Sequence, residues 1–123
     1  SNSSAASDVY KRQVWTWGSN SYGQLGTGDN INKAMPAKVM DIENAIDISV
    51  GSYNTVVVKD DGTVWSFGYN GYGQLGDGTS SSRNTPVQVI KQNGKPLEKI
   101  VKISAGTNKT IALDENGKVC LEQ

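Results

Sequence analysis

The glycine-rich stretch GYGQLG is the part of the sequence whose spacing could bind a phosphate. Gly71, Gly73 and Gly76 satisfy the G-x-G-x-x-G pattern of dinucleotide-binding loops, and they follow the apolar segment VWSF at residues 64–67. Such a loop must lead into a helix whose N-terminus faces the pyrophosphate. The residues that follow, GDGTSSSRNTP, are small and turn-forming and predict no helix. An earlier copy of the motif has Ser21 where Gly71 stands, so we interpret the motif as a structural corner.

The other reactive side chains predict no catalytic, cofactor or metal site. The chain contains no histidine, and its single cysteine, Cys120, has no imidazole partner. Asp60 and Asp61 are adjacent acids, but the glycine that follows them places them in a predicted hairpin turn. Neither Asp29 nor Asp77 begins the D-x-[DN]-x-[DN]-G spacing of a calcium loop. We therefore expect a protein that is not an enzyme and that uses no cofactor.

The charge balance predicts which kinds of partner the chain does not bind. Twelve basic and twelve acidic side chains give a net charge of zero, and the lysines near residue 95 alternate with other residue types. Nucleic acids and anionic membranes need clustered lysine and arginine, so we expect neither as a partner. One cysteine permits no internal disulfide, and the sequence does not indicate a compartment.

The corner motif belongs to an internal repeat of about fifty residues. Val14 recurs as Val64 and Gly26 as Gly76, both fifty positions later, whereas Gly51 recurs as Gly106 after fifty-five. The second copy therefore carries five extra residues, which lie in KQNGKPLEK. A period of this length is typical of propellers and arrays, in which each unit buries its apolar faces against its neighbours.

The repeat divides the chain into four segments. Residues 1–13 are expected to be foreign: Ser1 and Asn2 resemble a protease-cleavage scar, and SSAASDVYKRQ reads residue for residue as the translation of a widely used transposase sequencing adapter. The first repeat is then expected at 14–63, the second at 64–118 and the incomplete start of a third at 119–123.

Short β-branched segments between glycine, asparagine and aspartate turns predict an all-β fold. In the first copy we expect one four-stranded meander, with strands at residues 37–40, 45–50, 54–59 and 64–67. The turns DDG and ENG predict hairpins after the third strand of each copy. Trp15, Trp17, Trp65 and Phe67 are expected to pack as wedges between adjacent sheets.

Each predicted corner combines flexible glycines with one apolar anchor and one amide. The glycines permit crowded backbone, the leucine anchors the loop, and the glutamine satisfies loop N–H and carbonyl groups. Asn20 and Asn70 are expected to adopt left-handed backbone conformations, which asparagine tolerates. The corner residues are Tyr22, Gly23, Gln24, Leu25 and Gly26 in the first copy, and Tyr72, Gly73, Gln74, Leu75 and Gly76 in the second.

The string WGSNSYGQLGTGD, the later Pro36 and the segment ISVGSYNTVVVKDDGTVWSFG together resemble the regulator of chromosome condensation repeat. The resemblance covers essentially residues 14–119 and implies blades of a β-propeller, usually seven-bladed in this family. It also implies a protein-binding scaffold or a regulator, such as a nucleotide-exchange factor for a small GTPase or an inhibitor of a hydrolase. The chain departs from the family pattern G-x-x-H-T, because the two copies read GSYNT and GTNKT.

Loop residues that differ between the copies are the candidates for binding an unidentified protein partner, because repeat proteins vary their loops while keeping their core. We also expect the chain to form a homo-oligomer, since two blades alone expose faces that neighbouring blades would cover. The predicted fold is therefore two four-stranded antiparallel β-propeller blades completed by oligomerisation. The candidate partner-binding residues are Asn30, Ile31, Asn32, Lys33, Gln92, Asn93, Gly94, Lys95 and Pro96.

Overall fold

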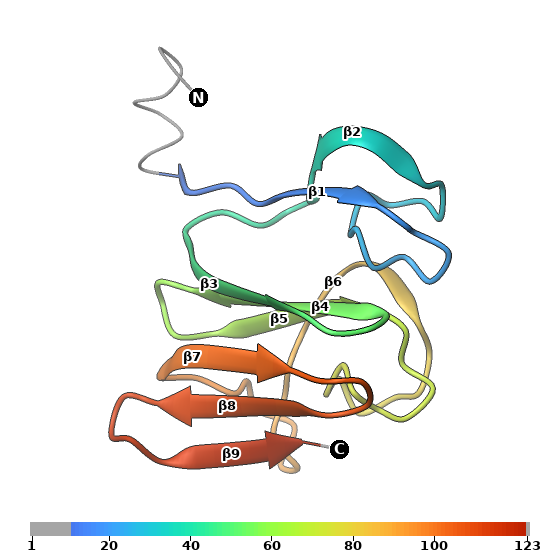
Figure 1. The fold of residues 1–123 in the computed structure, drawn as a ribbon. Coiled ribbons are helices and arrows are strands. Elements are labelled where there is room, and N and C mark those ends of the chain that lie inside the picture. Colours follow the sequence, from blue (N-terminus) through green and yellow to red (C-terminus); the bar gives the residue numbers. More distant parts are fainter. Residues whose placement is uncertain (1–10, 123) are drawn as a thin grey trace.

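The computed structural model describes the backbone of residues 11–122, and the side chains of residues 11–119. Its strands form three antiparallel sheets that stack on one another (Figure 1). None of the described residues forms a helix with the length and apolar character needed to cross a membrane. The strands are β1 (Trp15–Gly18), β2 (Lys33–Lys38), β3 (Ala45–Val50), β4 (Asn54–Lys59), β5 (Val64–Gly68), β6 (Arg83–Gln88), β7 (Ile100–Ala105), β8 (Thr110–Asp114) and β9 (Val119–Glu122).

The all-β, propeller-blade prediction is confirmed, but the strands are divided among the sheets differently from the prediction. One sheet is a complete four-stranded blade in the order β3-β4-β5-β6, and a two-stranded sheet (β1-β2) and a three-stranded sheet (β7-β8-β9) flank it. The complete blade therefore crosses the expected repeat boundary between residues 63 and 64, which lies in the β4–β5 hairpin.

The strand predicted at residues 37–40 was misplaced. It is β2, which runs from Lys33 to Lys38 and pairs with β1 instead of joining β3. Pro36 lies within it and has no N–H to donate, which suits the outer edge of a sheet. Sequence order alone suggested that β2 begins a new meander, whereas its hydrogen bonds make it the last strand of the preceding one.

The predicted hairpin turns are confirmed at both glycines. Gly62 has a φ of 83° and donates its N–H to the Lys59 carbonyl at 2.9 Å. Gly117 has a φ of 80° and donates to the Asp114 carbonyl at 3.0 Å. A β-branched residue could not adopt this backbone without strain, so glycine fixes both turns.

The central sheet has an apolar core on each of its faces, which explains the three consecutive valines in β4. Val57 and Phe67 pack toward the β1-β2 sheet, together with Val39. Val56 and Val58 point the opposite way and pack against the β7-β8-β9 sheet. Successive side chains of a strand alternate between its faces, so a strand covered on both sides needs apolar residues at every position.

The expectation that four aromatic residues act as wedges holds for two of them. Phe67 is fully buried between sheets, and Trp65 is half-buried with the Lys59 ammonium 5.4 Å from its ring centroid. Trp15 and Trp17 are 52% and 61% exposed. Within the described residues, β1 pairs with β2 alone, and the two rings line an open groove beside it.

The predictions for residues 1–10 and 123 lie outside the described part of the chain. The last residues of the expected foreign segment are described, and they lie against the start of β3. The Arg12 carbonyl accepts a hydrogen bond from the Ala45 N–H at 3.2 Å, and the Lys11 carbonyl accepts one from Asn44. The segment boundaries at 1–13, 14–63, 64–118 and 119–123 stay predictions.

Candidate protein-interaction surface at the repeat corners

Each corner loop is held together by one buried asparagine. The Asn20 side chain is fully buried, and its Nδ2 donates to the carbonyls of Asp29 and Ile31 at 2.9 and 3.0 Å. Its Oδ1 accepts from the Leu25 N–H at 3.0 Å. One amide thus joins the beginning, middle and end of the loop that connects β1 to β2.

The second corner repeats this arrangement around Asn70. Its Nδ2 donates to the carbonyls of Thr79 and Ser81, both at 2.9 Å, and its Oδ1 accepts from the Leu75 N–H at 3.0 Å. The predicted left-handed backbone at Asn20 and Asn70 was wrong, because neither has a positive φ. Asparagine is needed at these positions because its side chain carries both a donor and an acceptor.

The leucine of each corner is buried as predicted, and the glutamine satisfies a loop N–H group, which confirms one half of its predicted role. The Oε1 atoms of Gln24 and Gln74 accept hydrogen bonds from the N–H groups of Tyr22 and Tyr72 at 2.8 and 2.9 Å. The anchoring leucines are buried, with Leu75 fully inaccessible and Leu25 5% exposed in the first corner.

A glycine of the first corner lies directly against the strand that follows the second. A Cβ atom added to Gly23 would lie 2.5 Å from the Asn84 Cα atom. Its backbone also has a φ of 80°, so both the lack of space and the backbone conformation exclude a larger residue. Gly23 therefore lets the first corner approach β6 closely.

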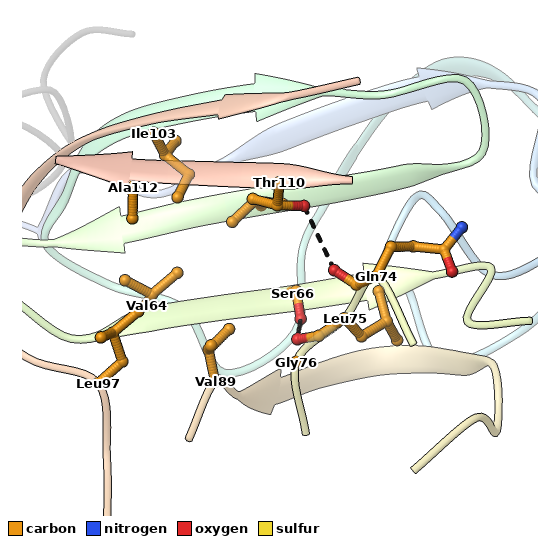
Figure 2. Close-up of a pocket in the computed structure, with 11 residues that line it drawn as sticks. Val64, Ser66, Gln74, Leu75, Gly76, Val89, Leu97, Ile103, Thr110 and Ala112 are labelled. Carbon is orange, nitrogen blue, oxygen red and sulfur yellow. Dashed lines mark hydrogen bonds between the residues drawn. The ribbon is translucent and has the colours of Figure 1, made fainter. Parts of the chain in front are cut away.

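Hydroxyl groups clamp each corner to its own strand and to the following blade. The Thr16 and Ser66 hydroxyls donate to the carbonyls of the corner leucines at 2.7 and 2.6 Å. Thr55, in β4, donates to the Gln24 carbonyl at 2.8 Å, although 31 positions separate the two residues. Thr110, in β8, does the same for Gln74 at 3.3 Å (Figure 2). The threonine of the G-x-x-x-T pattern thus links successive repeats.

A small hollow between two sheets lies beside this clamp and is a packing void. It holds about 20 Å³, close to the volume of one water molecule, between the central sheet and the β7-β8-β9 sheet. Figure 2 shows Val64, Leu97, Val89 and Ala112 around it. Its apolar walls offer a water too few polar partners, so we assign it no ligand.

Four tyrosines form a continuous cluster where the corners meet the β3–β4 turn. The ring of Tyr22 lies 5.1 Å from that of Tyr53 and 4.9 Å from that of Tyr69, between centroids. Tyr69 in turn lies 6.1 Å from Tyr72. The rings pack edge to face, and Tyr22, Tyr53 and Tyr72 are 40%, 49% and 65% exposed. In Figure 1 both corners and the β3–β4 turn lie on the same side of the stacked sheets.

Sequence reasoning missed this cluster because half of it does not follow the repeat. Tyr22 and Tyr72 correspond to each other fifty positions apart, but the position that corresponds to Tyr69 holds Ser19. Likewise, the position that corresponds to Tyr53 holds Asn108. Only the folded chain brings the four rings together.

The first group of candidate partner-binding residues is mostly engaged in holding its own loop. Asn32 Oδ1 accepts from the Asn20 N–H at 2.8 Å, and Lys33 forms an ion pair with Asp29 at 3.0 Å. Asn30 Oδ1 accepts a hydrogen bond from Asn84 Nδ2 at 2.9 Å, which joins the first corner to β6. Ile31 has no such role for its side chain, which is 64% exposed.

The acidic side chains of both corners are held in their charged form. Hydrogen bonds from the Ile31 N–H and from Lys33 lower the pKa of Asp29 below its usual 3.8. Burial raises the pKa of Asp77, but hydrogen bonds from Thr79 and from Arg83 outweigh this effect and lower it overall. Both carboxylates are therefore paired locally, and the surface around the corners is electrically balanced.

The second candidate group, Gln92 to Pro96, forms an exposed turn of its own. Gly94 has a φ of 81° and donates its N–H to the Lys91 carbonyl at 2.8 Å, and the Lys95 backbone N–H donates to Asn93 Oδ1 at 2.9 Å. Gln92 and Gly94 border the second corner across a shallow groove. No shared groove or hydrogen bond joins them to Asn30–Lys33 among the described residues.

The position at which the family has histidine is a buried asparagine. Asn54 is 1% exposed, and neither its Oδ1 nor its Nδ2 has a hydrogen-bond partner in the described part of the chain. In the second copy the corresponding residue is Lys109, which is exposed. Within the residues that the structure describes, no three metal-ligating side chains come together.

Comparison with known proteins identifies the repeat. The profile of the regulator of chromosome condensation (RCC1) repeat matches residues 13–58 and 61–113, and a second profile of that repeat matches residues 45–74. The structure resembles human WBSCR16, with a TM-score of 0.74 and 19% identity over 89% of this chain and 28% of that one.

Two structures of yeast Prp20 are also similar. Saccharomyces cerevisiae Prp20p, described together with its binding to Gsp1p and histones, has a TM-score of 0.74 and 28% identity over 89% of this chain and 28% of its own. Yeast RCC1 (Prp20) bound to Kap60 has a TM-score of 0.70 and 25% identity over 91% and 29%. The chain thus spans less than a third of these proteins. It belongs to the regulator of chromosome condensation (RCC1) repeat family, and its sheets are blades of that family's β-propeller.

Proposed function

We propose that this chain is a non-catalytic scaffold that binds another protein through the tyrosine cluster formed by Tyr22, Tyr53, Tyr69 and Tyr72. The observation that carries the proposal is the partial exposure of these rings on loops that are themselves tightly hydrogen-bonded. Tyrosine is enriched at protein interfaces because its ring buries a large area while its hydroxyl keeps a polar contact.

The rigidity of the corners supports this role. An interface residue on a mobile loop loses conformational entropy when it binds, whereas a residue fixed beforehand loses little. Tyr22 and Tyr72 have their N–H groups bound by the glutamine of the same corner, and Tyr69 donates its N–H to the Tyr53 carbonyl at 2.8 Å. The backbone of all four positions is therefore held in place before a partner arrives.

The surface chemistry favours a partner that is neither strongly acidic nor strongly basic. Lys33 and Arg83 are each paired with an aspartate of their own corner, and the groove beside Tyr22 is lined by Asn30, Ser82 and Asn84. The uncharged hydrogen-bonding groups suit a polar protein surface. Ile31 and the turn at Gln92–Pro96 are secondary parts of the proposed surface, because they are exposed and border the corners.

The test is quantitative affinity capture with the purified chain. We expect the double change Tyr53→Ser and Tyr72→Ser to remove the captured partner, whereas Met35→Ser, at a 75% exposed position on β2, should leave capture unchanged. Circular dichroism before and after confirms that each variant keeps its fold. Capture that survives the tyrosine changes refutes the proposed surface.

A regulatory role on a GTPase is the second candidate. It rests on the 28% identity to Prp20p, whose structure was described with its binding to Gsp1p. A panel of purified small GTPases, each loaded with a fluorescent nucleotide, tests it directly. Accelerated nucleotide release by the chain supports exchange activity, and binding without acceleration supports the scaffold alone.

A further inference from the structure

The sheets at the two ends of the stack each have an open edge. Among the described residues, β1 pairs with β2 alone and β9 pairs with β8 alone. Beside the open edge of β1 lies an apolar groove lined by Trp15, Trp17, Ile48 and Val50. These side chains are 42% to 67% exposed, which is unusual for large apolar residues gathered at one place.

The contact between the central sheet and the β7-β8-β9 sheet shows what fills such a groove. Ile48 lies opposite Val57 in its sheet as Ile103 lies opposite Ala112, so Ile48 and Ile103 are equivalent positions. Ile103 is 8% exposed, whereas Ile48 is 42% exposed. The difference arises because two valines of β4, Val56 and Val58, belong to the same core cluster as Ile103. Figure 2 shows Ile103 in this buried position. The groove beside β1 is therefore suited to bind a strand that, like β4, presents two branched apolar side chains on one face.

A strand of this type is present at the other end of the same chain. In β8, Ile111 and Leu113 occupy the positions that correspond to Val56 and Val58, because each lies opposite the equivalent residue of its neighbouring strands. Ile111 is 39% exposed and belongs to neither core cluster within the described residues. The outer face of β8 thus carries the branched apolar side chains that the groove needs.

The present partner of β8 is poorly suited to complete a blade. In the complete blade, Trp65 and Phe67 lie opposite Val57 and Thr55. At the corresponding positions of β9 the sequence has Cys120 and Glu122. Strand β1 is the repeat equivalent of β5, and there it carries Trp15 and Trp17, the two exposed rings.

We propose that copies of this chain assemble head to tail, with β8 of one copy pairing with β1 of the next in place of β9. The shared blade then contains β7 and β8 from one copy and β1 and β2 from the other. Each copy contributes one blade of its own and one shared blade, so two, three or four copies close rings of four, six or eight blades, which span the usual range of about four to eight. We expect the middle value, a ring of three copies. This inference is independent of the tyrosine cluster.

Lys102 is expected to weaken the contact between two copies, because a hydrogen bond found at the equivalent contact within the chain cannot form there. Within the chain, the Asp47 carboxylate accepts a hydrogen bond from the Ile103 N–H at 3.0 Å, and Ser49 accepts one from Ala105 at 2.9 Å. By register, Lys102 and Ser104 are the equivalents of Asp47 and Ser49. A serine can repeat its bond in the shared junction, but a lysine has no acceptor.

The first test measures the mass of the 123-residue chain by light scattering after gel filtration, from 1 to about 100 μM. We expect a trimer. The variant Lys102→Asp should lower the dissociation constant of each contact between copies about tenfold, because it gains one charge-assisted hydrogen bond. Lys95→Asp makes the same charge change on an exposed turn and should have no effect. A wild-type chain and a Lys102→Asp variant that both stay monomeric overturn the proposal.

The second test removes or traps the proposed contact. Trp15→Thr with Trp17→Thr should abolish assembly, whereas Met35→Thr should not; a Trp15/Trp17 variant that still forms trimers overturns the proposal. For trapping, Thr16→Cys and Ile111→Cys are combined with Cys120→Ser. Their equivalents, Ser66 and Val56, lie opposite each other between hydrogen-bonded pairs, where side chains are close enough for a disulfide.

The two engineered cysteines cannot meet within one copy, because their sheets lie on opposite faces of the central blade. Oxidation should therefore give covalent trimers that reducing agent separates. Monomers alone after oxidation overturn the strand pairing, and a ladder of ever larger species overturns ring closure.

Discussion

Replacing Asn70 with alanine should destabilise the fold far more than a typical substitution in a surface loop does. Asn70 is fully buried and makes three short hydrogen bonds to backbone groups, at 3.0, 2.9 and 2.9 Å. Each such bond stabilises a protein by about 1 kcal/mol net, and more when its loss leaves a buried group unpaired. We therefore expect Asn70→Ala to lower the free energy of unfolding by about 3 kcal/mol.

Asn70→Asp separates the hydrogen-bonding role of this residue from its size. Aspartate keeps the acceptor for the Leu75 N–H but presents an oxygen to the carbonyls of Thr79 and Ser81 and to the Asp77 carboxylate. Repulsion between these oxygens should make the aspartate variant less stable than the alanine variant at neutral pH.

Urea denaturation followed by tryptophan fluorescence measures both effects, and hydrogen exchange at the Leu75 amide reports the corner locally. Asn116→Ala is the matched control, because Asn116 is exposed in the β8–β9 turn and its side chain makes no hydrogen bond in the described residues. An Asn70→Ala variant within about 0.5 kcal/mol of the wild type contradicts the reasoning. So does an Asn70→Asp variant that is the more stable of the two.

Three further changes test other parts of the fold. Leu75→Ala should cost about 2–4 kcal/mol, since it enlarges a void in a buried site, whereas Lys95→Ala should stay within about 0.5 kcal/mol; equal urea midpoints would misplace the core. Asn54→Leu should raise the thermal midpoint, because it replaces an unpaired buried amide by an apolar group of similar size, and a lowered midpoint means that the amide has a partner in solution. The folded-state pKa of Asp77 lies below 3.8, so its carboxylate stabilises the fold above about pH 4, and this stabilisation is lost as the pH falls through the folded-state value. Asp77→Asn should flatten the acid dependence of stability in that range, and an unchanged acid limb of the denaturation profile would contradict this.

Local chemistry made part of this structure predictable from the sequence. The strands expected at residues 45–50 and 54–59 have those bounds, because each is a short segment rich in β-branched residues between turn-forming ones. Gly62 and Gly117 fix their hairpins by a backbone conformation that few other residues adopt. The repeated corner motif could be recognised from the sequence for a similar reason, since the asparagine, glutamine and leucine side chains of each corner act within their own loop.

Contacts between distant segments decided the rest. The assignment of β2 to the preceding blade depends on its pairing with β1, and Thr55 reaches the Gln24 carbonyl only because two blades are stacked. The tyrosine cluster gathers rings from three separate loops, two of them at positions that the repeat does not reproduce. A repeat in the sequence records what each unit needs for itself, whereas exposure and pairing depend on which neighbours lie beside it, and only the tertiary structure contains that information.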